Sequence, residues 1–94
     1  MRKGPRLGVD VGTVRVGIAR SDAEGLLAVP VETLARGSAL ASLATLVDDL
    51  QPLEVIVGLP LGLSGSATAS TEDAEAFARQ LAIQVSVPVR MVDE

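Results

Sequence analysis

The spacing of the apolar residues changes partway along the chain, and this change constrains the fold more than any other feature of the sequence. In the first third, apolar residues alternate with polar ones or run together, which predicts strands at 6–11, 14–21 and 26–34. The composition of residues 22–25 is typical of a hairpin turn. The apolar spacing then becomes three and four residues, which predicts a helix that begins after Ser38 and ends before proline 52.

The last part of the chain predicts two more strands and one more helix. Short apolar runs at 54–59 and 87–92 are typical of strands, and a loop is expected at 60–67. Between them we expect a helix at about 71–84, capped by Thr71. Its expected inward residues are Ala74, Phe77, Ala78 and Leu81. Three antiparallel strands followed by two right-handed crossovers predict an α/β fold with a mixed five-stranded sheet in the order 3-2-1-4-5. Because proline cannot donate to a ladder, Pro30 places the third strand at an edge.

The composition limits the chemistry that the chain can perform. Its 94 residues suffice for one domain, 1–94, and 48% of them are hydrophobic, so a packed core is expected. The sequence has no cysteine and no histidine, which excludes thiolate metal sites and the commonest general base. Catalysis would therefore depend on carboxylates, arginine or lysine, hydroxyl groups and backbone amides.

The charge is unevenly distributed. A net charge of −4 argues against a uniformly basic surface for nucleic acid. Most of the basic residues nevertheless lie near the N-terminus, at Arg2, Lys3, Arg6, Arg15 and Arg20. They form either a solvated basic arm or a positive rim around a phosphate site. No apolar stretch is long enough for a signal peptide or a membrane span, so we expect a soluble, cytoplasmic protein that does not enter a membrane.

Asp10 stands in the middle of an apolar stretch that includes the first predicted strand, where an unpaired buried carboxylate would be costly. In open α/β sheets, sites form at the carboxyl ends of the parallel strands. This rule would bring Asp10 close to Gly58, Asp93 and Glu94. Carboxylates bind Mg²⁺ or Mn²⁺, and such ions can drive phosphodiester cleavage and offset the cost of Asp10. The alternative is that Asp10 only caps a turn by bonding to its own backbone.

Several neighbours of these carboxylates could hold a phosphate backbone. Gly12 would let a phosphate approach the main chain, and Arg15 could grip it. The loop that begins at Gly58 and Pro60 and continues to Ser66 could cradle it. Each residue also has an ordinary explanation: a turn glycine, a solvated arginine and a plain connection.

Three segments together resemble the motifs of the YqgF/RuvX family. DVGTVRVGIARSD resembles the family's D-x-G-x-x-R-I-G-x-A-x-S-D, and VIVGLPLGLSGS resembles its V-V-G-L-P motif and following loop. VRMVDE resembles the start of its D-E-R-x-T-T motif. The resemblance implies a ribonuclease H-like fold and a nuclease that resolves Holliday junctions or matures the 5′ end of pre-16S ribosomal RNA. It assigns the acidic site to Asp10 and Glu94, and the first-motif arginine to Arg15.

The chain also departs from the family pattern. The R-x-T-T continuation and the last helix, which carries a third acidic residue in the family, do not follow Glu94, and Ser64 stands where Asp or Asn is common. We therefore expect an incomplete domain at the C-terminal side, with one sheet face exposed.

The resemblance implies a nuclease that uses Mg²⁺ or Mn²⁺ and acts on pre-rRNA or branched DNA, as a homodimer if it resolves junctions. Two alternatives stay open. Asp10–Thr13 reads D-V-G-T, like the first phosphate loop of actin and hexokinase, although that class needs a second domain. The chain could also be a non-catalytic module that binds nucleic acid or assembling ribosomes.

Overall fold

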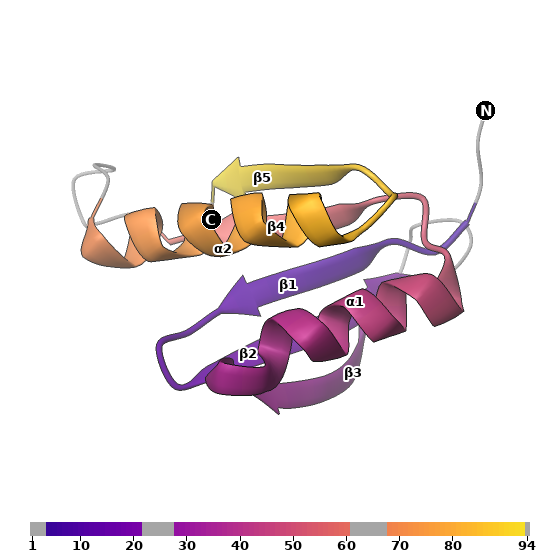
Figure 1. Ribbon diagram of the computed structural model, residues 1–94, viewed down its shortest axis with the longest axis horizontal. Helices are drawn as coiled ribbons and strands as arrows, with labels where there is room; N and C mark the ends of the chain where they lie inside the picture. The colour runs from indigo at the N-terminus through magenta and orange to yellow at the C-terminus, as the bar shows by residue number, and fades with distance from the viewer. Residues whose placement is uncertain (1–3, 22–27, 61–67, 94) are drawn as a thin grey trace.

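A mixed sheet in the order β3-β2-β1-β4-β5 forms the frame of the molecule (Figure 1). This computed structural model describes residues 4–21, 28–60 and 68–93. Its strands are β1 (Leu7–Val11), β2 (Arg15–Ser21), β3 (Ala28–Ala35), β4 (Val55–Leu59) and β5 (Val89–Asp93). The β1–β2 and β2–β3 pairs are antiparallel, and the β1–β4 and β4–β5 pairs are parallel. The predicted α/β class, the strand order and the edge position of the strand containing Pro30 are confirmed.

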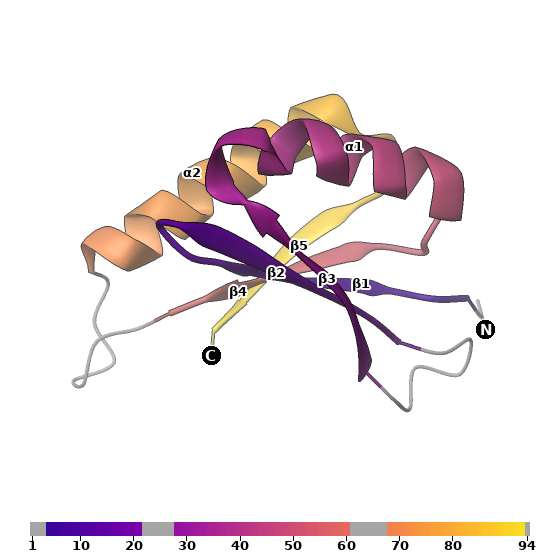
Figure 2. The same cartoon turned by 90° about the horizontal axis from the view of Figure 1, so that it is seen from below.

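Both helices lie on one face of this sheet (Figure 2). A short 3₁₀ turn, η1 (Arg36–Ser38), leads into α1 (Ala39–Leu50), and α2 (Ala69–Gln84) crosses from β4 to β5. In the described ranges no element covers the opposite face, which we call the open face. Neither of these helices has the length and hydropathy that crossing a bilayer requires.

The first helix has the predicted place but not the predicted cap. Ser38 precedes it, yet the Ser38 side chain makes no capping hydrogen bond to the helix and instead donates to the carbonyl of Ala35 over 3.4 Å. The chain enters α1 through η1. At the other end Gln51 adopts a left-handed conformation, with φ of 50°, and its N–H bonds to the carbonyl of Val47. Pro52 follows this stop.

The second helix begins earlier than predicted, and the assignment of its cap to Thr71 is wrong. Thr68 is the N-cap: its side chain accepts from the Thr71 N–H, and the Thr71 side chain accepts from the Thr68 N–H. This capping box satisfies two backbone donors at once, which a cap at Thr71 could not do. The other predicted boundaries agree with the observed elements within about two residues. The turn predicted at 22–25 and most of the loop predicted at 60–67 lie outside the described residues.

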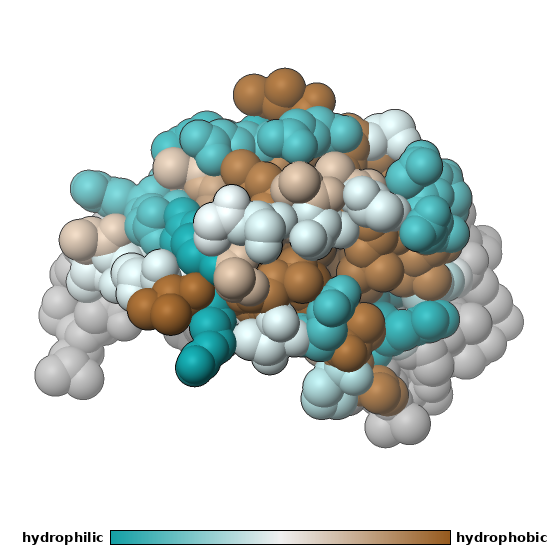
Figure 3. Space-filling view, turned by 60° about the horizontal axis from the view of Figure 1, so that its bottom comes forward, coloured by the Kyte–Doolittle hydropathy of each residue, from teal (hydrophilic) through white to brown (hydrophobic). Residues whose placement is uncertain are grey.

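The core lies between the helices and one face of the sheet. Alternate residues of β1, namely Leu7, Val9 and Val11, are buried, as the strand period requires. The inward residues predicted for the second helix are confirmed as buried: Ala74, Phe77, Ala78 and Leu81. Figure 3 shows the helix-bearing side obliquely, with brown apolar surface between teal and white polar bands. The two helices cover the buried residues, and both polar and apolar side chains lie on the outer surface of this side (Figure 2 and Figure 3).

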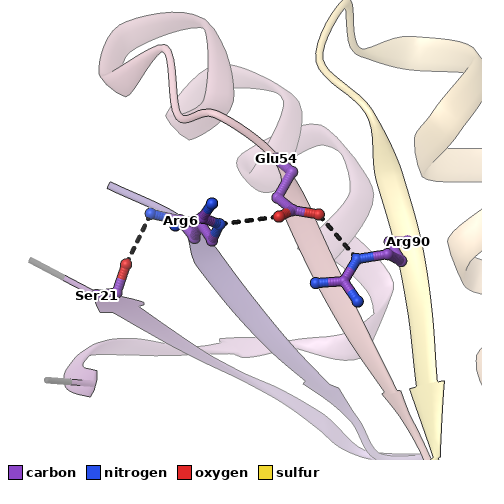
Figure 4. A network of polar contacts seen from close by, with 4 residues as sticks. All are labelled: Arg6, Ser21, Glu54 and Arg90. Carbon is purple, nitrogen blue, oxygen red and sulfur yellow. Dashed lines mark hydrogen bonds and ion pairs between the residues drawn. The ribbon is translucent and has the colours of Figure 1, made fainter. Parts of the chain in front are cut away.

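At the edge of the sheet where β1 and β4 begin, one carboxylate joins three neighbouring strands (Figure 4). Glu54 accepts from the Nε of Arg6 over 2.8 Å and from the Nε of Arg90 over 2.9 Å. The backbone N–H of Arg6 in turn donates to the hydroxyl of Ser21 over 2.9 Å. The hydrogen bond from Arg90, and then that from Arg6, lower the pKa of Glu54 against the opposing effect of its burial. Glu54 therefore stays ionised and ties the strand ends together.

Glu54→Gln is expected to lower the free energy of unfolding at pH 7 by about 1 kcal/mol, because both charge-assisted bonds are weakened. Since the folded-state pKa of Glu54 is lowered, its contribution is complete above the unfolded-state value of about 4.3 and disappears as the pH falls through the folded-state value. Denaturant unfolding at pH values from 7 down to 3 measures this difference. The exposed Glu32→Gln is the control, and a difference that persists undiminished at pH 3 would contradict the assignment.

Candidate functional site

Asp10 lies on the open face of the sheet. Its neighbours along β1, Val9 and Val11, point into the core, so strand alternation turns Asp10 and Gly8 to the other side. The carboxylate is exposed. The expectation of a costly buried charge is therefore wrong, because this face has no helix over it in the described residues. Asp10 is available to a ligand without a desolvation penalty for the free protein.

Glycines flank Asp10 on both neighbouring strands. The register pairs Asp10 with Gly17 of β2 and with Gly58 of β4. A Cβ atom at Gly17 would lie 3.9 Å from the Cβ of Asp10, so its absence opens space beside the carboxylate. These residues contribute to a hollow of about 550 Å³ on the open face, whose wall also includes Ile56 and Val92. The hollow gives the carboxylate room for a cation and an extended ligand.

Glu32 on β3 lines the same hollow, and sequence reasoning missed it. The register of the β2–β3 pair shifts between Ile18 and Ala19, so the side-chain alternation of this edge strand is interrupted. No short motif signals such a shift.

The turn after β1 requires the glycine at position 12. The Gly12 N–H donates to the carbonyl of Arg15 over 2.9 Å. A Cβ on Gly12 would lie only 2.7 Å from that same oxygen. The prediction of a turn at Gly12 is therefore confirmed. Arg15 is exposed at the start of β2, and alternation places it on the same face as Gly17 and hence as Asp10.

Gly12→Ala is expected to lower the free energy of unfolding by about 1–3 kcal/mol, because the new methyl group would overlap the Arg15 carbonyl and force the turn to open. Chemical denaturation checks this value. Gly37→Ala is the matched control, since a Cβ there meets nothing within 4 Å. Equal stability of the Gly12 variant and the native chain would show that the turn can relax freely.

The carboxyl ends of β1, β4 and β5 point to the same edge of the sheet (Figure 1). Gly58 lies directly beside Asp10 on β4. Pro60 follows, and its carbonyl accepts a hydrogen bond from the hydroxyl of Thr71, a buried side chain of α2. Thr71, which sequence reasoning took for a cap, thus also anchors the end of β4.

Asp93 does not share a face with Asp10. Its register partner is Leu59, whose side chain is buried on the helix side. Val92 is the β5 residue beside Gly58 on the open face. Ser66 and Glu94 lie outside the described residues. Among residues 4–21, 28–60 and 68–93, no group of three or more acidic, histidine or cysteine side chains could hold a metal ion. Asp10 is the predicted ligand that the structure places toward the hollow.

Arg36 holds the turn at Gly12 through hydrogen bonds, and no sequence motif indicated this contact. Its Nη1 donates to the carbonyl of Gly12 over 2.9 Å and to Asp73 over 2.6 Å, and its Nη2 donates to Asp73 over 2.8 Å. The guanidinium also lies 5.1 Å from the ring centre of Phe77. The hydrogen bond to Asp73 raises the pKa of Arg36, and the reciprocal bond lowers the pKa of Asp73. Both groups remain charged at neutral pH.

The comparisons with known proteins identify the family. The model of the RuvX family, described as Holliday junction resolvase, matches residues 4–94. This chain belongs to the RuvX family. A protein of Leifsonia xyli subsp. xyli named "Putative pre-16S rRNA nuclease" is 57% identical over 97 residues, which cover 100% of this chain and 63% of that protein. A protein of the same name from Clavibacter michiganensis subsp. michiganensis is 55% identical over 98 residues, covering 100% of this chain and 61% of that protein. The RuvX chain described here thus spans somewhat under two thirds of these relatives.

The solved structures agree on the fold. RuvC of Thermus thermophilus superposes with a TM-score of 0.69 at 19% identity, covering 95% of this chain and 63% of RuvC. The same protein in complex with a Holliday junction substrate gives 0.68 at 17% identity, covering 96% of this chain and 64% of RuvC. The predicted ribonuclease H-like fold is confirmed.

Proposed function

We propose that this RuvX protein is a divalent-metal-dependent nuclease that cleaves phosphodiester bonds in structured nucleic acid. The observation that carries the proposal is the exposed Asp10 carboxylate, which faces a hollow beside the carboxyl ends of the parallel strands. Membership of the RuvX family supports the same activity.

The metal would be Mg²⁺ or Mn²⁺, held by Asp10 and Glu94 as its protein ligands. Exposed carboxylate oxygens are the ligands that these hard cations prefer, and the missing side chains at Gly17 and Gly58 leave space for hydrated ions. When bound, such ions activate water and stabilise the leaving oxygen. Asp93 lies on the other face of the sheet, so direct ligation of the same ion by Asp93 and Asp10 is the less favoured arrangement.

The nucleic-acid backbone would lie across the rim next to Asp10. Arg15 stands on the same face and would contact a phosphate, and Gly12 keeps the turn short enough for that approach. The other side of the bound nucleic-acid backbone would contact Gly58, Pro60 and Ser66. The net charge of −4 makes this local contact more important than any overall attraction.

The substrate we favour is the 5′ leader of pre-16S ribosomal RNA, cut in the cytoplasm, because the relatives at 57% and 55% identity are named for it. The family description favours a second candidate, the four-way DNA junction. Two symmetric cuts in a junction require two active sites, so that activity would need a homodimer.

The test is cleavage of a labelled pre-16S leader and of a labelled four-way junction by the native polypeptide that carries this chain. Each substrate is incubated with Mg²⁺, with Mn²⁺ and with EDTA. Metal-dependent cleavage of the leader supports the proposal, and cleavage of the junction alone shifts it to the second candidate. Tight binding without cleavage in either metal overturns the nuclease and favours a non-catalytic binding module.

A further inference from the structure

We propose that Arg36 is a positioning residue, which locks the Gly12–Arg15 turn and thereby sets where Arg15 stands relative to Asp10. The inference rests on the proposed nuclease function for its consequence, although the lock itself follows from geometry alone. Arg36 is distant from the turn in sequence and reaches it twice. Its backbone N–H donates to the carbonyl of Val14 over 2.9 Å, and its Nη1 donates to the carbonyl of Gly12 over 2.9 Å.

Arg15 itself pairs with Ala35 of β3, but Gly12–Val14 before it have few other attachments among the described residues. Val14 is 71% exposed, and Gly12, Thr13 and Arg15 are exposed as well, so the turn has no buried apolar anchor. Its internal bond, from the Gly12 N–H to the Arg15 carbonyl, closes the loop, and the strand pairs Val11–Val16 and Arg15–Ala35 hold its two ends but not the residues between them. Loops with few buried contacts open locally at low cost. The two bonds from Arg36 supply the missing attachment.

Arg36 can act as an anchor because α2 immobilises it. Asp73 accepts a hydrogen bond from each Nη atom of Arg36. This bidentate arrangement fixes a guanidinium in orientation as well as in position. The ring of Phe77 lies beneath the guanidinium, and the Arg36 side chain is only 26% exposed. Phe77 is buried in the core, so the turn is connected through Arg36 to the packed core.

The same helix also holds the other side of the proposed site. Thr71, six residues before Phe77 on α2, donates to the carbonyl of Pro60 just after β4. The start of α2 is therefore linked through Arg36 to the turn before β2, and through Thr71 to Pro60, the residue that follows β4. Through Arg36 and Thr71, one helix sets the spacing between the two segments that border Asp10.

Lysine cannot replace Arg36 in this role. A single ammonium group lacks the planar fork that bonds Asp73 through two nitrogens while one of them also reaches Gly12. We therefore expect Arg36→Lys to keep the charge pair and lose most of the lock. Arg36→Gln removes the charge as well. Arg79→Gln is the matched control, because Arg79 pairs with Glu75 on the same helix, over 3.5 Å, away from the turn.

The first readout is amide hydrogen exchange of Gly12, which does not depend on activity. In the native polypeptide we expect exchange to become about tenfold faster in Arg36→Gln and intermediate in Arg36→Lys, since a bond from a charged donor is lost. Arg79→Gln should leave the rate unchanged. Unchanged exchange in Arg36→Gln would overturn the lock.

The second readout is cleavage kinetics at a temperature well below unfolding. We expect Arg36→Gln to raise the KM for the nucleic acid about tenfold while kcat changes little, because a displaced Arg15 weakens binding. Combined with Arg15→Gln, the Arg36→Gln change should add almost nothing further, since both act through one contact. Fully additive effects, or an unchanged KM with faster exchange, would overturn the positioning role. If the native protein cuts nothing, the proposed function fails together with this consequence, while exchange still decides the lock.

Discussion

Asp10→Asn is expected to reduce metal-dependent cleavage by at least about a thousandfold, since loss of the proposed metal ligand would remove several kcal/mol of transition-state stabilisation and each 1.4 kcal/mol is a factor of ten. The stability of the protein should hardly change. Asp10 is exposed on the open face, and asparagine has nearly the same size, so the free energy of unfolding should stay within about 0.5 kcal/mol.

Single-turnover cleavage of the preferred substrate in Mg²⁺ and in Mn²⁺ measures the activity, and denaturant unfolding measures the stability. Asp49→Asn on the exposed side of α1 is the matched control and should retain full activity. An Asp10→Asn protein that cuts at the native rate would remove Asp10 from the reaction and return it to the role of a strand residue.

Phe77→Ala is expected to have the largest effect on stability, a loss of about 3–5 kcal/mol in the free energy of unfolding. Phe77 is the sole aromatic residue and is 2% exposed between α2 and the sheet. Truncation leaves a cavity in a core that otherwise consists of smaller aliphatic side chains, and it also removes the ring beneath Arg36. A domain of this size has little stability to spare, so partial unfolding at 37 °C is expected.

Two further variants in α2 serve as controls for this loss, which is measured by denaturant unfolding. Phe77→Leu retains most of the buried volume and should lose clearly less than Phe77→Ala. Ile83→Ala removes an apolar side chain that is 85% exposed and should change the free energy of unfolding by less than about 0.5 kcal/mol. Similar losses for Phe77→Ala and Ile83→Ala would mean that α2 does not pack on the sheet as described.

Local sequence patterns were sufficient for the elements and for their order. The change of apolar spacing after Leu34 separates strands from helix, and Pro30 marks an edge strand. Together with two right-handed crossovers, these elements predicted the order 3-2-1-4-5, which the structure confirms. The N-cap of α2 was harder to predict from the sequence, because Thr68, Ser70 and Thr71 are all residue types that cap helices well. Only the reciprocal hydrogen bonds between Thr68 and Thr71 identify Thr68 as the cap.

Part of the candidate site could likewise be predicted from the sequence, and part depends on the register of the strands. Its location at the carboxyl ends of the strands follows from topology, and Gly12 is the turn glycine that its neighbours suggested. Which acidic side chain shares a face with Asp10 depends on register, and a shift of one residue reverses the face. The pairing of Asp93 with Leu59 therefore separates Asp93 from Asp10 although both stand near the same edge.

The order of strands and helices, the inward residues of α2, the family motifs and the place of Asp10 on the first strand could all be determined from the sequence, because each depends on residues close together in the chain. The tertiary structure alone decided that Asp10 faces solvent and that Arg36 joins Gly12 to Asp73. Those contacts link positions 24 and 37 residues apart. Such contacts form only when the packing of α2 against the sheet brings these distant residues together, and no local pattern records that geometry.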